Sequence, residues 1–96
     1  MSAYYITHRV TEGDEETMKL YSSKVNATFE PYGGVKTVRT SDIEIIEGDW
    51  DPDRMTIIRF PDMDSLKGWY NGPEYADLKA MRHGVMKSNA VAVVGE

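Results

Sequence analysis

The sequence contains no cysteine. This absence excludes disulfide bonds, thiolate metal sites and cysteine nucleophiles, and it fits a reducing compartment, so we expect a cytoplasmic protein. No basic segment followed by an apolar one opens the chain, and we therefore expect no signal peptide. No apolar run approaches the length of a transmembrane helix, which predicts that the protein has no membrane partner.

Positive charge is scarce as well. The chain has 11 Lys and Arg residues against 16 Asp and Glu residues, and its formal net charge is −5. The basic residues are spread along the sequence, whereas a surface that binds a phosphate backbone needs them clustered. We therefore expect no nucleic-acid partner.

The sequence contains no complete metal-binding motif. Asp49-x-Asp51-x-Asp53 resembles the start of a calcium-binding loop. Such a loop needs Gly at its sixth position and Glu at its twelfth, where this chain has Arg54 and Phe60. The two histidines lack the spacing of transition-metal ligands. We read the segment as an acidic surface loop and expect neither a metal nor a cofactor.

A chain of 96 residues with 41% hydrophobic and 28% charged residues is typical of one globular domain, here residues 1–96. The residue pattern predicts an α+β protein of ferredoxin-like order, β-α-β-β-α-β: a four-stranded antiparallel sheet with two helices on one face. Five segments have strand patterns, 4–10, 35–40, 43–47, 54–60 and 89–94, and the second and third of them are expected to form a hairpin through Ser41-Asp42.

Helical spacing predicts the two helices. The first starts in the acidic turn 12–16 and ends at Pro31 and Gly33-Gly34. The second starts after Asp62, a favourable N-cap, and is interrupted at Asn71-Gly72-Pro73 before it continues.

The predicted strands are apolar on both faces. Ile57 and Ile58 point to opposite sides of one strand, and Val93 and Val94 to opposite sides of another. Because two helices cover only one face of a sheet, the other face needs a second cover. We expect a homodimer formed through that sheet face, and the alternative is a different protein as partner.

Several short blocks of the sequence resemble one bacterial family. They are Tyr32-Gly33-Gly34 with Arg39, Glu47-Gly48-Asp49-Trp50, Arg54 with Phe60-Pro61, Trp69-Tyr70 with Pro73-Glu74-Tyr75, and Arg82 with Asn89. On these blocks the chain resembles the domain of unknown function 1330 family. The resemblance implies a ferredoxin-like fold in the dimeric α/β-barrel superfamily, where two sheets close into a barrel. Related families hold organic substrates between helices and sheet, but a shared fold does not transfer the chemistry.

Arg82 is the most informative candidate catalytic residue. Helical spacing places it on the stripe of Tyr75 and Leu78, which should face the sheet. A buried guanidinium there would anchor an anion such as a substrate carboxylate. The alternatives are an internal ion pair or an arginine that extends from the helix end to solvent.

His8 is the second candidate catalytic residue. It alternates with Tyr4 and Ile6 and so lies on an apolar face of the first strand. A neutral imidazole at that place can move a proton at physiological pH. The alternative is a hydrogen-bonded histidine of the core or of its rim.

Four further residues are predicted to bind a ligand: Tyr32, Arg39, Trp69 and Tyr75. Trp69 and Tyr75 would wall an apolar slot, or else serve only in core and dimer packing. Tyr32 and Arg39 both stand in the family blocks. One interpretation of these blocks places Arg39 and Glu47 at pocket edges, although the expected hairpin register puts the two on opposite faces. The expected hairpin register offers a plainer role for Arg39, a charge pair with Glu44, and likewise pairs Lys36 with Glu47.

Two functional hypotheses follow. In the first, the protein binds and transforms a small organic acid or aromatic compound without a cofactor, with Arg82 as anion anchor and His8 as proton carrier. In the second, it is a non-catalytic dimeric module that binds a metabolite or serves only a structural purpose.

Overall fold

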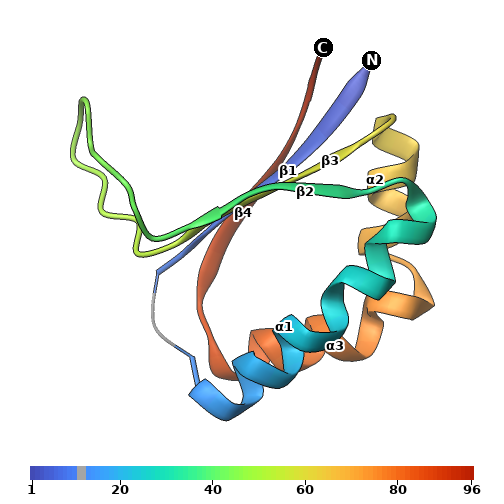
Figure 1. Cartoon of the computed structure of the whole chain (residues 1–96), viewed down its shortest axis with the longest axis horizontal. Coiled ribbons are helices and arrows are strands. Elements are labelled where there is room, and N and C mark those ends of the chain that lie inside the picture. The colour runs from blue at the N-terminus through green and yellow to red at the C-terminus, as the bar shows by residue number, and fades with distance from the viewer. Residues whose placement is uncertain (11–12) are drawn as a thin grey trace.

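The computed structural model describes residues 1–10 and 13–96 (Figure 1). Its elements are β1 (Ser2–Arg9), α1 (Glu15–Phe29), a 3₁₀ turn η1 (Glu30–Tyr32), β2 (Val35–Thr40), β3 (Met55–Phe60), α2 (Met63–Tyr70), α3 (Pro73–Val85) and β4 (Ser88–Gly95). Within these described stretches, every helix is too short or too polar to cross a membrane.

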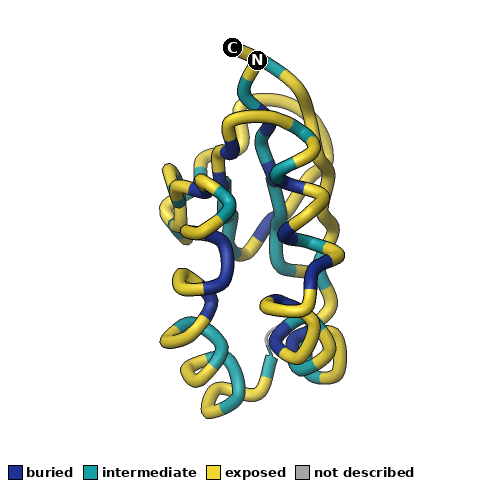
Figure 2. The backbone as a smooth tube through the Cα atoms, turned by 90° about the vertical axis from the view of Figure 1, so that its right-hand side faces the viewer, coloured by how far each residue is buried: buried dark blue, intermediate teal, exposed yellow. Residues whose placement is uncertain are grey.

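The four strands form one antiparallel sheet in the order β2-β3-β1-β4, and the helices lie on one of its faces (Figure 1). The α+β class and the four-stranded antiparallel sheet are thus confirmed. The largest fully buried side chains are Trp69, Tyr75, Phe29 and Phe60, which come from both layers. Figure 2 shows buried stretches on the helices and on the strands, while β4 is exposed along most of its length.

Local sequence signals explain the helix ends. Asp14 and Asp62 cap α1 and α2, and their carboxylates accept hydrogen bonds from the backbone N–H groups of Thr17 and Ser65. The chain leaves η1 through Gly33, whose φ of 80° suits glycine. The predicted interruption of the second helix is confirmed, since α2 ends at Tyr70 and α3 begins at Pro73. Part of the expected acidic turn, residue 12, lies outside the described residues.

The predicted hairpin of 35–40 with 43–47 is wrong. Residues 43–47 form no strand, and β2 pairs instead with β3, so that Arg39 lies opposite Thr56. Residues 41–54 form a long connection that projects from the rest of the molecule (Figure 1). Ser41-Asp42 is a weak turn signal, and Ile46 is 86% exposed, so no packing holds this apolar segment beside β2. The expected charge pairs with Glu44 and Glu47 therefore do not form.

An irregularity in β2 changes which side chains face the helices. Lys36 pairs with Ile58 and Val38 pairs with Ile57, which leaves Thr37 as an extra residue between them. The Thr37 hydroxyl donates to the carbonyl oxygen of Ile57 at 3.2 Å. In a regular strand Lys36 and Arg39 would point to opposite faces. The bulge places both on the helix-covered face.

None of the helices in the described residues lies on the opposite face of the sheet, and we call it the open face. The strand registers assign the following residues to it: Tyr4, Ile6, His8, Val35, Val38, Thr40, Met55, Ile57, Arg59, Asn89, Val91 and Val93. Most of them are apolar, and Val91 is 56% exposed. The prediction that both faces of the sheet are largely apolar is therefore confirmed.

Candidate functional site

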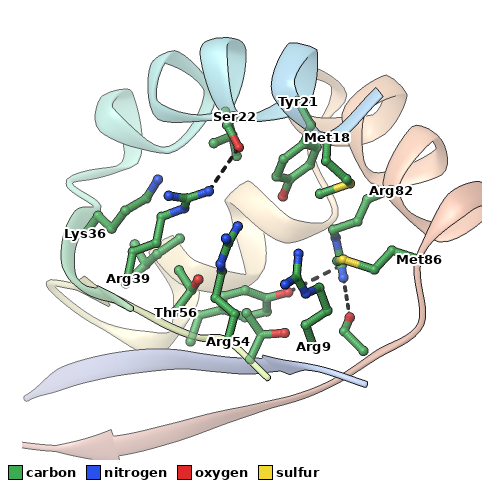
Figure 3. Close-up of a pocket in the computed structure, with 15 residues that line it drawn as sticks. Arg9, Met18, Tyr21, Ser22, Lys36, Arg39, Arg54, Thr56, Arg82 and Met86 are labelled. Atoms are coloured by element: carbon green, nitrogen blue, oxygen red, sulfur yellow. Dashed lines mark hydrogen bonds between the residues drawn. The ribbon is translucent and has the colours of Figure 1, made fainter. Parts of the chain in front are cut away.

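A cavity of about 80 Å³ lies between the sheet and the helices α1 and α3 (Figure 3). Strands β1, β2 and β3 form its floor, and α1 and Arg82 of α3 border it on the helix side. A wider hollow of about 500 Å³ shares several lining residues with the cavity, among them Arg9, Ser22 and Arg39. This hollow therefore lies at the mouth of the cavity.

The cavity lining is strongly basic although the whole chain is acidic. Its charged residues are Arg9, Lys36, Arg39, Arg54 and Arg82, and no Asp or Glu is among the lining residues that the structure describes. The formal net charge of the chain is −5. Cations gathered around a cavity with low-dielectric walls focus a positive potential inside it, which favours an anionic ligand.

Arg82 is buried at the wall of this cavity, with only 5% of its surface exposed. Its guanidinium donates from Nε to the Tyr75 hydroxyl at 3.3 Å and from Nη1 to the Ser88 hydroxyl at 2.6 Å. Nη2 lies 3.5 Å from the Tyr5 hydroxyl and 3.2 Å from Nε2 of His83. The expectation that Arg82 faces the sheet is confirmed.

The groups around Arg82 do not neutralise its charge. Burial raises the pKa of the Tyr5 and Tyr21 hydroxyls well above the usual value, so both stay protonated at neutral pH. Tyr21 and Tyr75 share a hydrogen bond of 2.7 Å between their hydroxyls. No carboxylate of the described residues forms an ion pair with Arg82. An internal ion pair, one of the expected alternatives, is thus not formed by the described part of the chain.

Lys36 and Arg39 form a second cationic group on the β2 side of the cavity (Figure 3). Arg39 Nη2 donates to the Ser22 hydroxyl at 3.4 Å, and Lys36 Nζ lies 5.7 Å from the centroid of the Phe29 ring. Burial and, to a lesser degree, the charge of Arg39 lower the pKa of Lys36. The two cations therefore repel one another in a partly desolvated place.

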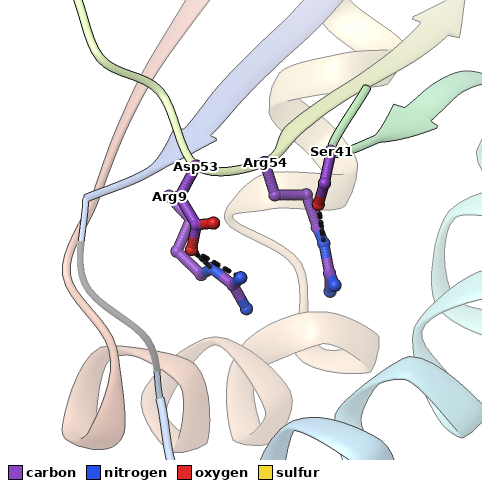
Figure 4. A network of polar contacts seen from close by, with 4 residues as sticks. All are labelled: Arg9, Ser41, Asp53 and Arg54. Carbon is purple, nitrogen blue, oxygen red and sulfur yellow. Dashed lines mark hydrogen bonds and ion pairs between the residues drawn. The ribbon is translucent and has the colours of Figure 1, made fainter. Parts of the chain in front are cut away.

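Two arginines at the mouth make polar contacts at the ends of the 41–54 connection: Arg9 of β1, and Arg54, the last residue of the connection itself (Figure 4). Arg9 forms an ion pair with Asp53, with Nε 2.7 Å from Oδ2. Arg54 Nε donates to the Ser41 hydroxyl at 3.5 Å. Within residues 1–10 and 13–96, no three His, Asp or Glu side chains come together as metal ligands.

The structure separates His8 from Arg82. His8 lies on the open face, whereas the cavity lies on the covered face. Its Nε2 is 3.4 Å from the Asn89 amide nitrogen, and its ring meets Trp50 edge-on with centroids 5.6 Å apart. The buried Nδ1 atom has no hydrogen-bond partner among the described residues. Within one subunit, His8 and Arg82 cannot act on the same small molecule.

The other predicted ligand-binding residues have different surroundings. Trp69 is fully buried, stacks on Tyr75 with ring centroids 4.3 Å apart, and donates from Nε1 to the Thr28 hydroxyl at 3.0 Å. Tyr32 donates to Glu74 at 2.7 Å on the surface. Neither Trp69 nor Tyr32 lines the cavity. Tyr75 reaches the site only through its hydroxyl, which contacts Arg82.

No role was predicted from the sequence for three residues that border the cavity, Tyr5, Tyr21 and Ser88. Tyr5 and Ser88 contact Arg82 through their hydroxyls, and Tyr21 is hydrogen-bonded to Tyr75, which contacts Arg82. One signal was present: Tyr21 lies on the apolar stripe of its helix. A buried tyrosine hydroxyl needs a polar partner, which marks such a position as a candidate neighbour of a buried arginine.

A family model described as a domain of unknown function (DUF1330) matches residues 2–96. The chain belongs to the DUF1330 family. The match confirms the resemblance carried by the sequence blocks, and the family description names no activity. No curated protein matches this DUF1330 chain.

Solved structures share the fold of this DUF1330 protein at low sequence identity. A protein of unknown function from Rhodopseudomonas palustris, RPA0582, is 16% identical with a TM-score of 0.75, over 99% of this chain and 82% of that one. A dimeric ferredoxin-like protein of unknown function from Jannaschia sp. CCS1 is 10% identical with a TM-score of 0.78, over 99% and 100%. SnoaB, a cofactor-independent oxygenase from Streptomyces nogalater, is 14% identical with a TM-score of 0.70, over 99% and 93%. These similarities establish a ferredoxin-like fold for the chain.

Proposed function

We propose that this protein binds a small organic anion in the cavity and holds its acidic group on Arg82. The observation that carries the proposal is a buried arginine at the cavity wall, Arg82, whose guanidinium lacks a carboxylate partner in the described chain. A buried charge without a counter-charge is costly, and a ligand carboxylate would supply one. A guanidinium has five N–H donors, and the four contacts of Arg82 leave at least one for the ligand.

The rest of the lining favours an organic anion over an inorganic one. Val25 and Ile58 contribute apolar surface to the cavity, and Met18 and Met86 contribute thioethers. A volume of about 80 Å³ is well below the roughly 300–1,000 Å³ of sites for drug-sized ligands. The proposed ligand is therefore a small acid with a short carbon skeleton.

Cofactor-independent conversion of that acid is the second candidate function. The Tyr21–Tyr75 hydroxyl pair beside Arg82 favours it, because such hydroxyls stabilise negative charge that develops on a bound substrate. The description of SnoaB as a cofactor-independent oxygenase gives a precedent on this fold. The alternative, a non-catalytic binding module, predicts that the same ligand is recovered unchanged after incubation.

The proposed assembly is a homodimer in which two open faces meet and close a barrel. The apolar residues of the open face support it, as does the Jannaschia neighbour, which is described as dimeric. Trp50 of the 41–54 connection contacts His8 on the open face, so this connection extends the same surface. In such a dimer His8 belongs to the interface and not to the anion site.

Calorimetric titration with small carboxylates tests the proposed anion site. We expect Arg82→Gln to lose affinity about 10- to 100-fold, because a hydrogen bond to a charged group contributes about 1.5–3 kcal/mol. Lys24→Gln is the charge-matched control, since Lys24 of α1 is exposed and lies outside the cavity. If Arg82→Gln does not fold, Arg82→Lys, which keeps the positive charge, is titrated in its place. Unchanged affinity in a folded Arg82 variant would overturn the proposal.

A further inference from the structure

The cavity has two cationic poles, and we infer that its ligand is a short dicarboxylate. This inference rests on the proposed anion site at Arg82 and adds a second acidic group to the ligand. Arg82 enters from α3, and Lys36 and Arg39 enter from β2. Figure 3 shows the two groups on different sides of the same cavity.

The second pole has the features of a binding group. Neither Lys36 nor Arg39 forms an ion pair with a carboxylate of the described residues. The bulge at Thr37 brings both side chains to the covered face, whereas a regular strand would place one of them on the open face. Two adjacent cations without a counter-charge repel one another, and a bound carboxylate would relieve that repulsion.

The cavity lining also includes apolar surface for a short hydrocarbon chain. Ile58, the register partner of Lys36, lines the cavity floor, and Val25 lines it from α1. Thr7 and Thr56 also line the cavity and offer hydroxyls to a substituted chain. With a volume of about 80 Å³, the cavity fits acids of about four to six carbons better than long or polycyclic ones.

Matched acids provide the test. Calorimetric titrations at one fixed ionic strength would compare succinate with butyrate and glutarate with valerate, so that each pair has equal carbon number and differs by one carboxylate. We expect at least one dicarboxylate to bind about 10-fold or more tightly than its matched monocarboxylate. Equal affinities within both pairs would overturn the dicarboxylate inference.

A double variant separates local recognition from overall charge. Lys36→Gln with Arg39→Gln is expected to reduce dicarboxylate affinity to that of the monocarboxylate and to leave monocarboxylate binding at Arg82 within about 3-fold. Lys24→Gln with Lys67→Gln removes the same charge at exposed positions outside the cavity and should preserve the preference. If the variant Lys36→Gln with Arg39→Gln still preferred dicarboxylates, the proposed binding of a second carboxylate by Lys36 and Arg39 would be wrong.

The outcomes distinguish this inference from the proposed function. If the monocarboxylates and the dicarboxylates bind equally and only Arg82→Gln weakens them, the anion site stands and the second pole is wrong. If none of the four acids binds the wild-type protein, both proposals fail.

Discussion

Trp69 does not line the cavity, but it packs against a residue that holds Arg82 in place. Its ring stacks on Tyr75, which contacts Arg82, and its Nε1 donates to Thr28. We expect Trp69→Phe to lower the free energy of unfolding by about 1–3 kcal/mol, because the Thr28 hydroxyl loses a buried partner and the smaller ring leaves a gap. Urea denaturation followed by circular dichroism measures this loss.

The matched control is the same exchange at an exposed position. Trp50 is 50% exposed within one subunit, so Trp50→Phe should lower the free energy of unfolding by less than Trp69→Phe does. Equal effects of the two exchanges would contradict a structural role for Trp69.

At the residue scale, the sequence predicted the side of a helix or strand on which a side chain lies better than it predicted the residues that the side chain contacts. Helical spacing correctly placed Arg82 toward the sheet, because the 3.6-residue period fixes direction. Its contacts with Tyr5 and Ser88 could not be read, since these residues come from β1 and β4, far away in the sequence. His8 was correctly placed on an apolar face, but both faces are apolar, and the sequence did not tell which one the helices cover.

The helix caps link element stability to pH. Hydrogen bonds from Thr17 lower the pKa of Asp14, and the backbone N–H of Ser65 does the same for Asp62. A lowered pKa in the folded state means that the ionised carboxylate favours folding above its unfolded pKa of about 3.9. This stabilisation is lost as the pH falls through the lower, folded-state pKa. We therefore expect the melting temperature to fall as the pH drops below about 4.

Asp62→Asn isolates the contribution of one cap. Asparagine also caps helices but does not titrate in this range. Melting curves between pH 3 and pH 7 should show a shallower acid decline for the variant than for the wild type. An identical decline would mean that Asp62 does not contribute to the pH dependence.

The error at the element scale concerns the 41–54 connection. Ile43, Ile45 and Ile46 gave the pattern of a strand, but pattern alone does not supply a neighbouring strand, and β3 occupies the place beside β2. The bulge at Thr37 has no signature in the sequence either. Arg39 was placed in the site from the sequence, but because the bulge directs Lys36 into the cavity as well, the pairing of the two cations could not be predicted without the backbone.

At the scale of the whole molecule, one sheet serves two purposes. Its covered face supplies Arg9, Lys36 and Arg39 to a basic cavity, and its open face presents apolar side chains. A domain of 96 residues buries too little surface for both faces to be covered from within. The proposed dimer resolves this by using the open face for association, which leaves the cavity of each subunit free for a ligand.

Two valines of β4 test this arrangement because they differ in face and match in exposure. Val91 lies on the open face opposite Ile6 and is 56% exposed, while Val94 lies on the covered face opposite Ala3 and is 55% exposed. We expect Val91→Glu to shift the protein from dimer to monomer in sedimentation velocity, because dimerisation would bury the new carboxylate without a partner. Val94→Glu should leave the dimer intact. A monomeric wild-type protein, or equal effects of the two substitutions, would show that the open face is not where two copies meet.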